Sequence, residues 1–128
     1  MTHDPPIRVL IADDDPGVLD ALASLIEADD GLELAAVAAD AAEAVELAAR
    51  EQPDIALIDV RMPAGGGLEA ARGIATNSPR TTIIAFSASG ALPATLKPIV
   101  AGCIVKGTRV KEVVSMLKGY ADRELSPS

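Results

Sequence analysis

Short apolar runs alternate with segments of helical periodicity along this 128-residue chain. The central run, residues 55–58, holds no polar residue, which is typical of a strand buried on both faces of a parallel sheet. A strand followed by a helical segment recurs five times, and the expected strands are residues 7–12, 32–38, 55–58, 82–86 and 102–105. Such alternation predicts a parallel sheet covered by helices on both faces, with right-handed crossovers.

Five such units fit a doubly wound α/β fold with the flavodoxin-like strand order 2-1-3-4-5. The run 32–38 is the weaker strand, and we expect it near an edge of the sheet. The fourth helical segment, residues 90–100, differs from the others because it holds Pro93 and Pro98. Proline removes an amide donor and disfavours helical angles in the residue before it. We therefore expect a shortened or irregular fourth helix.

Helix boundaries are marked by capping residues. Asp15 followed by Pro16 favours a helix start, and Asp40 with Glu43 three residues later resembles a capping box. Thr108 is expected to cap the last helix, which we predict to stop near Gly119. We expect one domain over residues 1–121 and a tail or the start of a linker at 122–128.

Bulk composition narrows the class of protein. Hydrophobic residues make up 49% of the chain, which favours a folded domain. The net charge of −8 argues against direct contact with nucleic acid or an anionic membrane. Cys103 is the single cysteine, so no internal disulfide is possible and a reducing compartment is favoured. With no signal-peptide segment at the N-terminus, we expect a cytoplasmic location.

One strand end carries the first chemical signal. Asp59 directly follows the apolar run 55–58, and Pro63 and glycines 65–67 then form a loop with little side-chain bulk. A carboxylate at the end of a buried strand is costly unless a cation or donors meet it. Glycines 65–67 lack the Lys-Ser/Thr of a P-loop, so we interpret them as a flexible loop.

Other polar side chains follow the other strands. The residues at these strand ends are Asp13, Asp14, Asp59, Ser87 and Lys106. Because the carboxyl ends of parallel strands lie on one edge of a sheet, these residues should converge. Asp13 and Asp14 could instead cap the first helix, but Asp15 is better placed for that role. Ser87 and Lys106 could be ordinary surface residues, although both positions favour the site.

Three neighbouring carboxylates repel one another unless a cation is present. Mg²⁺ would relieve this repulsion, because it binds about six oxygen ligands, often including carboxylates and several waters. Asp59 could then act as a nucleophile toward phosphorus, since a carboxylate can form an acyl phosphate. Ser87 and Lys106 would contact phosphoryl oxygens, as phosphoryl transfer requires charge neutralisation and positioning.

The segments VLIADDDP, PDIALIDVRMP, AFSAS and IVKGT, in this order, resemble the receiver domain of bacterial response regulators. The resemblance covers roughly residues 7–120. It implies transfer of a phosphoryl group from a sensor histidine kinase to Asp59. It also implies Mg²⁺ held by Asp14 and Asp59 directly, by Asp13 through water and by the carbonyl of Arg61, with Ser87 and Lys106 on the phosphoryl group.

The resemblance further implies that phosphorylation is relayed as a conformational or oligomeric change, homodimer formation included. The turn IADDDP looks most like regulators that carry a helix-turn-helix DNA-binding output domain. Transcription would then be controlled through DNA bound by that other domain, while this domain contacts neither nucleic acid nor membrane. Its own phosphorylation and dephosphorylation would be the reactions it catalyses, so we do not class it as an enzyme.

Two departures from the family pattern keep alternatives open. Cys103 stands where the family usually has a Tyr or Phe that moves with phosphorylation, and the segment between Ser87 and Lys106 looks short. A receiver-fold interaction module that switches without phosphorylation is therefore one alternative. A phosphatase of the haloacid-dehalogenase kind is another, but Arg61 stands where that class needs a second Asp, and the chain has no room for a cap domain.

Overall fold

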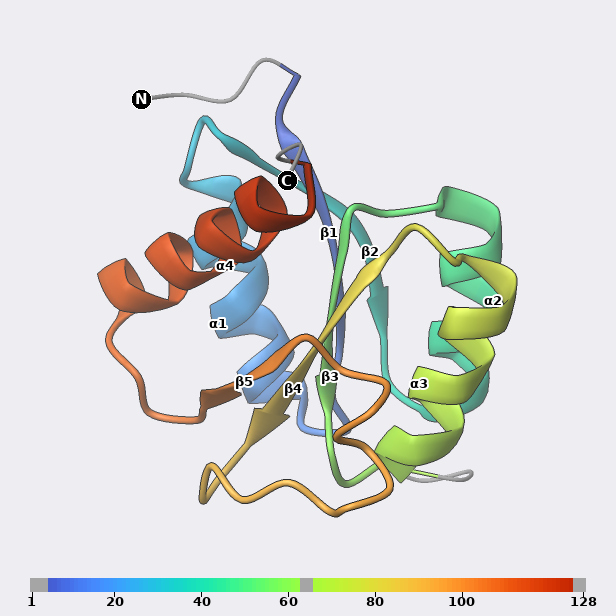
Figure 1. The fold of residues 1–128 in the computed structure, drawn as a ribbon. Helices are drawn as coiled ribbons and strands as arrows, with labels where there is room; N and C mark the ends of the chain where they lie inside the picture. The colour runs from blue at the N-terminus through green and yellow to red at the C-terminus, as the bar shows by residue number, and fades with distance from the viewer. Residues whose placement is uncertain (1–4, 63–65, 126–128) are drawn as a thin grey trace.

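The computed structural model describes residues 5–62 and 66–125, with side chains described as far as residue 122. Its centre is a five-stranded parallel sheet in the order β2-β1-β3-β4-β5, which confirms the predicted topology and the edge position of β2 (Figure 1). The strands are β1 (Ile7–Ala12), β2 (Leu32–Ala38), β3 (Ile55–Asp59), β4 (Thr82–Ser87) and β5 (Gly102–Val105).

Helices cover both faces of this sheet. They are α1 (Pro16–Glu27), α2 (Ala41–Glu51), α3 (Gly66–Asn77) and α4 (Val110–Leu125). Figure 1 shows α1 and α4 on one face and α2 and α3 on the other. In the parts of the chain that the structure describes, no helix has the length and apolar character needed to cross a membrane.

The core is divided by the sheet into two apolar clusters. Leu57 of β3 packs on the α1 and α4 side, whereas Ala56 and Ile58 pack on the α2 and α3 side. Every residue of β3 is buried. This burial on both faces is what the unbroken apolar run predicted for a central parallel strand.

The capping predictions hold in detail for the first two helices. Asp15 caps α1, and its Oδ1 accepts a hydrogen bond of 2.8 Å from the amide of Gly17. Asp40 caps α2 by accepting a 2.8 Å bond from the amide of Glu43. The Glu43 carboxylate reaches back to the amide of Ala39 at 2.7 Å, one residue before the cap. Asp13 and Asp14 are therefore not needed as caps.

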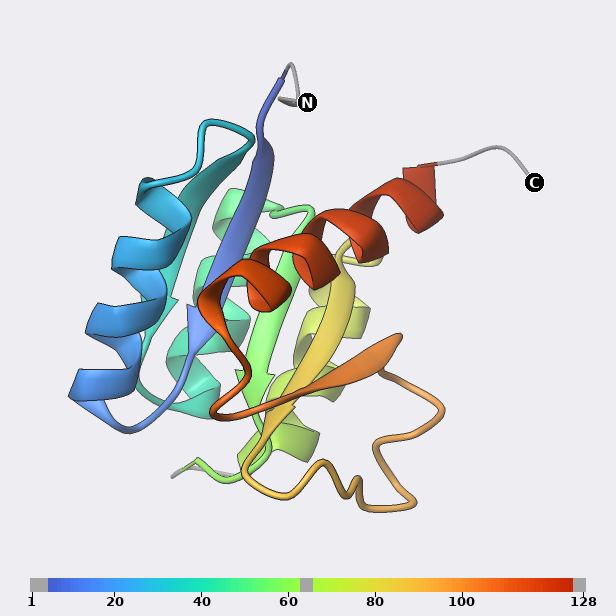
Figure 2. The ribbon, with the colours of Figure 1, turned by 90° about the vertical axis from the view of Figure 1, so that its left-hand side faces the viewer.

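The segment between β4 and β5 is more irregular than a short helix. Among the described residues it contains turns and no helix, with amides of Ile99 and Val100 both donating to the carbonyl of Leu96. Leu96 is only 3% exposed and anchors the segment in the cluster on the α2 and α3 side. Figure 2 shows this connection swinging out from the edge of the sheet before it returns as β5.

Two sequence-based expectations need correction. The last helix does not stop near Gly119 but runs from Val110 to Leu125. Burial of Leu117 and Ala121 on either side of Gly119 outweighs the cost of about 1 kcal/mol for glycine in a helix. Thr108 is not its cap, because the Thr108 hydroxyl donates to the carbonyl of Val105 and the helix begins at Val110.

The predicted flexible glycine loop is also only partly a loop. Gly66 and Gly67 begin α3, and a Cβ at Gly67 would lie 2.8 Å from the Cα of Val60. Gly67 is thus required for close backbone packing. Pro63 and Gly65 lie outside the described residues, as do residues 126–128 of the predicted tail.

Candidate functional site

The five strand-end residues meet at the carboxyl edge of the sheet. Asp13 and Asp14 follow β1, Asp59 ends β3, Ser87 ends β4 and Lys106 follows β5. A cavity of about 730 Å³ opens there, lined by Asp14, Asp59, Ser87 and Lys106 and by Val60, Arg61 and residues 88, 89 and 91–93. The sheet topology alone brings together residues that are up to 93 positions apart in the sequence.

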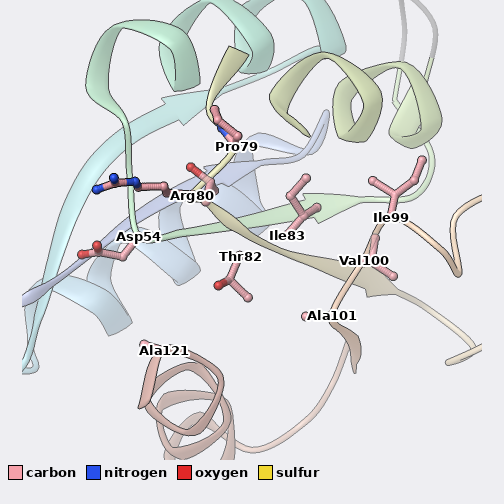
Figure 3. Close-up of a pocket in the computed structure, with 10 residues that line it drawn as sticks. Asp54, Pro79, Arg80, Thr82, Ile83, Ile99, Val100, Ala101 and Ala121 are labelled. Atoms are coloured by element: carbon pink, nitrogen blue, oxygen red, sulfur yellow. The ribbon is translucent and has the colours of Figure 1, made fainter. Parts of the chain in front are cut away.

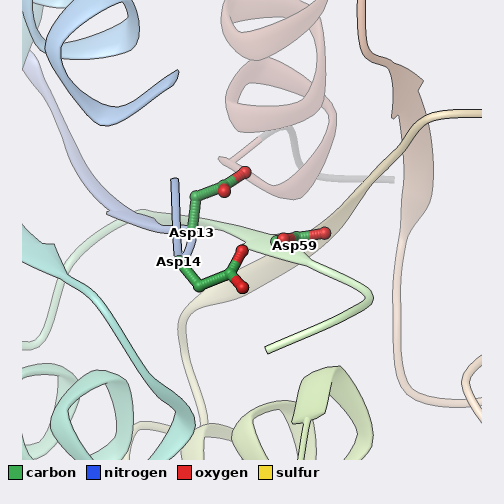
Figure 4. Close-up of side chains that lie close together, drawn as sticks. All are labelled: Asp13, Asp14 and Asp59. Carbon is green, nitrogen blue, oxygen red and sulfur yellow. The ribbon is translucent and has the colours of Figure 1, made fainter. Parts of the chain in front are cut away.

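The three carboxylates form one cluster. Asp13, Asp14 and Asp59 each place an oxygen within 4.8 Å of the others (Figure 4). Asp13 is fully buried and Asp59 is 3% exposed, while Asp14 is exposed to solvent. Asp13 Oδ1 accepts a 2.9 Å bond from the amide of Asp15, and Asp59 Oδ1 accepts a 3.1 Å bond from the amide of Arg61. Local turns thus hold two of the three carboxylates in place.

Lys106 supplies a positive charge inside this cluster. Its Nζ lies 2.9 Å from Asp13 Oδ2 and 3.4 Å from Asp59 Oδ1. The Lys106 side chain is 27% exposed, so it is not a freely solvated surface lysine. One ammonium cannot balance three carboxylates, which leaves the cluster with an excess of negative charge.

The donor set fits a hard divalent cation. All the side-chain ligand atoms that the cluster offers a metal are carboxylate oxygens, the ligand type that Mg²⁺ prefers. Asp13 Oδ2 is buried and receives no well-directed hydrogen bond, its polar neighbour being the Lys106 ammonium. A buried carboxylate oxygen with so little compensation indicates that the cluster is built to work with further positive charge.

Electrostatics distinguish the groups of the site. Burial raises the pKa of the Asp59 carboxyl, and the charge of Asp13 adds to the rise, although the Arg61 amide and Lys106 act in the opposite direction. Burial alone would lower the pKa of Lys106, but its contacts with Asp13 and Asp59 outweigh that effect and the pKa is raised. Lys106 therefore stays charged at neutral pH, and the charged form of Asp59 is destabilised by its burial.

Ser87, the last residue of β4, also lines the cavity. It is 3% exposed, and its hydroxyl donates to the carbonyl of Ala91 at 3.4 Å while accepting from the amide of Ser89 at 3.4 Å. Both distances are long for hydrogen bonds of these types. The hydroxyl is consequently held weakly, and it is free to turn toward an oxyanion in the cavity.

One residue of this site was missed from the sequence. The ring of Phe86 lies beside Lys106, with its centroid 5.5 Å from Nζ. The signal that could have found it is register, because Phe86 pairs with Asp59 across β3 and β4. Only two residues of the chain are Phe or Tyr and none is Trp, so an aromatic residue at this place was itself informative.

A second cavity lies at the opposite edge of the sheet. It measures about 450 Å³ and lies between the amino end of β4, the segment before β5 and Ala121 of α4 (Figure 3). It exists because β5 first pairs at Ile84, which leaves the start of β4 paired with β3 on one side and without a strand on the other. None of the predicted site residues lines it. Since ligands of open α/β sheets bind at the carboxyl edge, we assign function to the first cavity.

Comparison with known proteins agrees with this geometry. The family model of the response regulator receiver domain matches residues 9–118 of the chain. Over 124 residues the chain is 30% identical to the transcriptional regulatory protein MctR of Rhizobium johnstonii, a match covering 94% of this chain and 58% of MctR. Over 79 residues it is 39% identical to protein-glutamate methylesterase/protein-glutamine glutaminase 4 of Myxococcus xanthus, a match covering 62% of this chain and 22% of that protein.

A solved structure with the same fold is the receiver domain of sensor histidine kinase PA1611 from Pseudomonas aeruginosa. It superposes with a TM-score of 0.79 at 25% identity, covering 91% of this chain and 98% of that one, and it holds a magnesium ion in its active site cleft. The chain spans less than two thirds of the length of each of these two curated relatives. Their whole-protein activities therefore do not transfer with the match.

Proposed function

The chain belongs to the response regulator receiver domain family, and from that premise we propose that it accepts a phosphoryl group from a sensor histidine kinase on Asp59. The observation that carries the proposal is the placement of Asp59. Its carboxylate is buried at a strand end, 3.4 Å from the Lys106 ammonium, in a cavity that Ser87 also lines. A carboxylate so placed can serve as a nucleophile while its neighbours neutralise charge.

The proposed reaction is a displacement at phosphorus. A carboxylate oxygen of Asp59 forms a bond to the phosphorus of the donor phosphohistidine while the bond from phosphorus to the imidazole nitrogen breaks. The imidazole keeps the bonding electron pair and takes up a proton, and Asp59 becomes an acyl phosphate. Lys106 and Ser87 would each bind one phosphoryl oxygen, and burial of Asp59 limits the access of water.

Magnesium is the cofactor that this proposal includes. Asp14 and Asp59 would bind it directly, Asp13 through water and Arg61 through its carbonyl. When bound, the cation supplies charge neutralisation for the phosphoryl oxygens. Support comes from the all-oxygen cluster of Asp13, Asp14 and Asp59 and from the ion in the related Pseudomonas structure.

The output of the proposed phosphorylation lies beyond this domain. The curated relatives include a transcriptional regulator and a methylesterase, so receiver domains of this kind serve different outputs. We propose transcription control through a DNA-binding domain, with a conformational or oligomeric change such as homodimer formation as the relay. The family match leaves the phosphatase hypothesis without support.

The direct test is chemical phosphorylation. Incubation with phosphoramidate or acetyl phosphate and Mg²⁺ should add a single phosphoryl group to the wild type, measured by intact mass. Asp59→Asn should abolish the adduct. Asp54→Asn is the matched control, because Asp54 stands just before the same strand at its opposite end and should leave the adduct unchanged. An unmodified wild type, or an adduct that survives in Asp59→Asn, would refute the proposal.

A second function remains worth testing because of two specific features. Cys103 offers no ring to move, and no helix stands between β4 and β5 in the described residues. Both favour an interaction module that switches without phosphorylation. Light scattering with and without Mg²⁺ and beryllofluoride tests the module, which predicts one unchanged oligomeric state. Dimerisation that depends on beryllofluoride would count against it.

A further inference from the structure

Phe86 is part of the site but has no role in the proposed reaction. It stands directly before Ser87 on β4 and pairs in register with Asp59. Its side chain is 6% exposed and packs in the core cluster on the α1 and α4 side of the sheet. The ring therefore lies beside the cavity that would hold the phosphoryl group, and it is not among the residues that line that cavity.

The ammonium of Lys106 lies between this ring and two carboxylates. Nζ is over the Phe86 ring at 5.5 Å from the centroid, 2.9 Å from Asp13 Oδ2 and 3.4 Å from Asp59 Oδ1. A cation within about 6 Å of a ring face is attracted by the ring quadrupole, more strongly where water is excluded. The Lys106 side chain is 27% exposed, so solvent screens this attraction only in part.

A further cavity beside Lys106 gives its side chain another place to go if the attraction to the ring is lost. A cavity of about 220 Å³ lies between α1 and the start of α4, and both Phe86 and Lys106 line it. The other side chains that line it are mainly apolar and include Val18, Leu22, Val110 and Val113. Lysine has a long, flexible side chain. Loss of the ring would enlarge this space and let the Lys106 stem and water enter it.

We propose that Phe86 is a positioning residue for Lys106. Its ring holds the ammonium close to Asp13 and Asp59, where a phosphoryl oxygen on Asp59 would meet it, and fills space beside the cavity between α1 and α4 that the lysine could otherwise enter. Phe86 touches no reacting atom, so its whole effect passes through Lys106. The effect of Phe86 on phosphorylation rests on the proposed function of Asp59. The contact between Phe86 and Lys106 does not depend on that function.

The kinetic test is a double-mutant cycle on phosphorylation by phosphoramidate at saturating Mg²⁺. Phe86→Leu keeps an apolar side chain but removes the ring, and should slow the reaction about threefold to tenfold. Phe86→Tyr should restore the rate. Ile84→Val is the matched control, since Ile84 faces the same core cluster two residues earlier on β4, and it should leave the rate unchanged.

The second half of the cycle uses Lys106→Met as the background. Because Phe86 acts through the ammonium, Phe86→Leu should have no further effect on the much slower rate of Lys106→Met. A similar slowing in both backgrounds would show that the ring acts on general packing, and that result would overturn the proposal.

Two measurements that need no phosphorylation separate this inference from the proposed function. The Lys106 ε-methylene protons should show an upfield ring-current shift by NMR that Phe86→Leu abolishes and Phe86→Tyr keeps. In urea, Phe86→Leu should raise the unfolding constant about threefold more in wild type than in Lys106→Met. If wild type takes no phosphoryl group, the proposed function fails while these two results still decide the inference. Absence of both the shift and the coupling would overturn it.

Discussion

At the scale of single residues, the site holds buried charged groups that lower the stability of the folded state. Burial is the main cause of the raised pKa of Asp59, with the charge of Asp13 adding to it. A raised pKa means that the folded state holds the proton more tightly than the unfolded state. Stability must then fall as pH rises through the window between the ordinary value of 3.8 and the raised value.

This sign leads to a prediction for Asp59→Asn without divalent cation. At pH 7.5 in EDTA the variant should be more stable than wild type by about 1 kcal/mol, or ~4 °C in Tm for a domain of this size. Below the ordinary pKa the advantage should disappear, because wild-type Asp59 is then protonated. Thermal unfolding from pH 3 to 8 measures the difference, with Asp54→Asn as control. A variant that melts at or below wild type in EDTA would contradict the prediction.

The residue scale also shows what sequence reasoning can find. The convergence of the five strand-end residues could be predicted because parallel topology brings strand ends together, whatever their separation in the chain. Phe86 was missed because its contact with Lys106 depends on how far that side chain reaches back across the sheet. Strand register could have placed Phe86 beside Asp59, but the reach of the Lys106 side chain follows from packing, which periodicity does not contain.

At the scale of elements, the strands were predicted closely and the end of the last helix was not. Each strand is an apolar run with polar or turn residues beside it, so its bounds are visible in the sequence. Gly119 resembled a helix stop, but a stop signal is weak against packing. Leu117 and Ala121, which are 0% and 2% exposed, keep α4 against the core on both sides of Gly119.

The same reasoning predicts that Gly119→Ala stabilises the domain. A Cβ at Gly119 meets nothing within 4 Å, and glycine within a helix costs about 1 kcal/mol relative to alanine. Urea unfolding should show a gain of roughly 0.5–1 kcal/mol. Gly73→Ala is the contrasting variant, because a Cβ there would overlap the methyl groups of Val45 where α3 meets α2. A loss of stability in Gly119→Ala would mean that α4 does not continue through this position.

A pH-dependent contact ties α4 to the turn after α1. The Lys118 ammonium lies 2.8 Å from Asp29 Oδ1, and it and the Gly31 amide hold the pKa of Asp29 below its ordinary value of 3.8. A lowered pKa in an acid gives stability that is fully present above the unfolded value and is lost as pH falls through the folded one. Both side chains are about a quarter exposed, so the pair is worth ~1 kcal/mol at most.

Lys118→Met should therefore lower stability at pH 6 and lose most of that effect at pH 2. Urea unfolding at the two pH values measures the change. Lys111→Met serves as control, because Lys111 is an exposed lysine of the same helix and should show no such dependence on pH. An equal effect of Lys118→Met at both pH values would assign its role to the apolar stem of the lysine.

At the scale of the whole molecule, the candidate site lies at one edge of the sheet, and an irregular connection lies beside it. The segment that follows Ser87 contains turns in place of a helix, and the Ser87 hydroxyl is held by two bonds of 3.4 Å. Pro93 and Pro98 predicted this irregularity. The sequence did not show that one buried residue, Leu96, would be the anchor of the segment.

This arrangement predicts where the phosphorylated state differs. A phosphoryl analogue on Asp59 that draws the Ser87 hydroxyl toward it must break both weak bonds and reposition residues 88–92. Amide hydrogen exchange with Mg²⁺ and beryllofluoride should therefore change severalfold in residues 88–92, while residues 82–83 at the opposite edge should stay unchanged. Asp59→Asn should abolish the change, and Ser87→Ala should reduce it while leaving binding of the analogue detectable. If exchange changes equally at both edges of the sheet, the response is global stabilisation by the ligand, and the weak hold on Ser87 is not the element that responds.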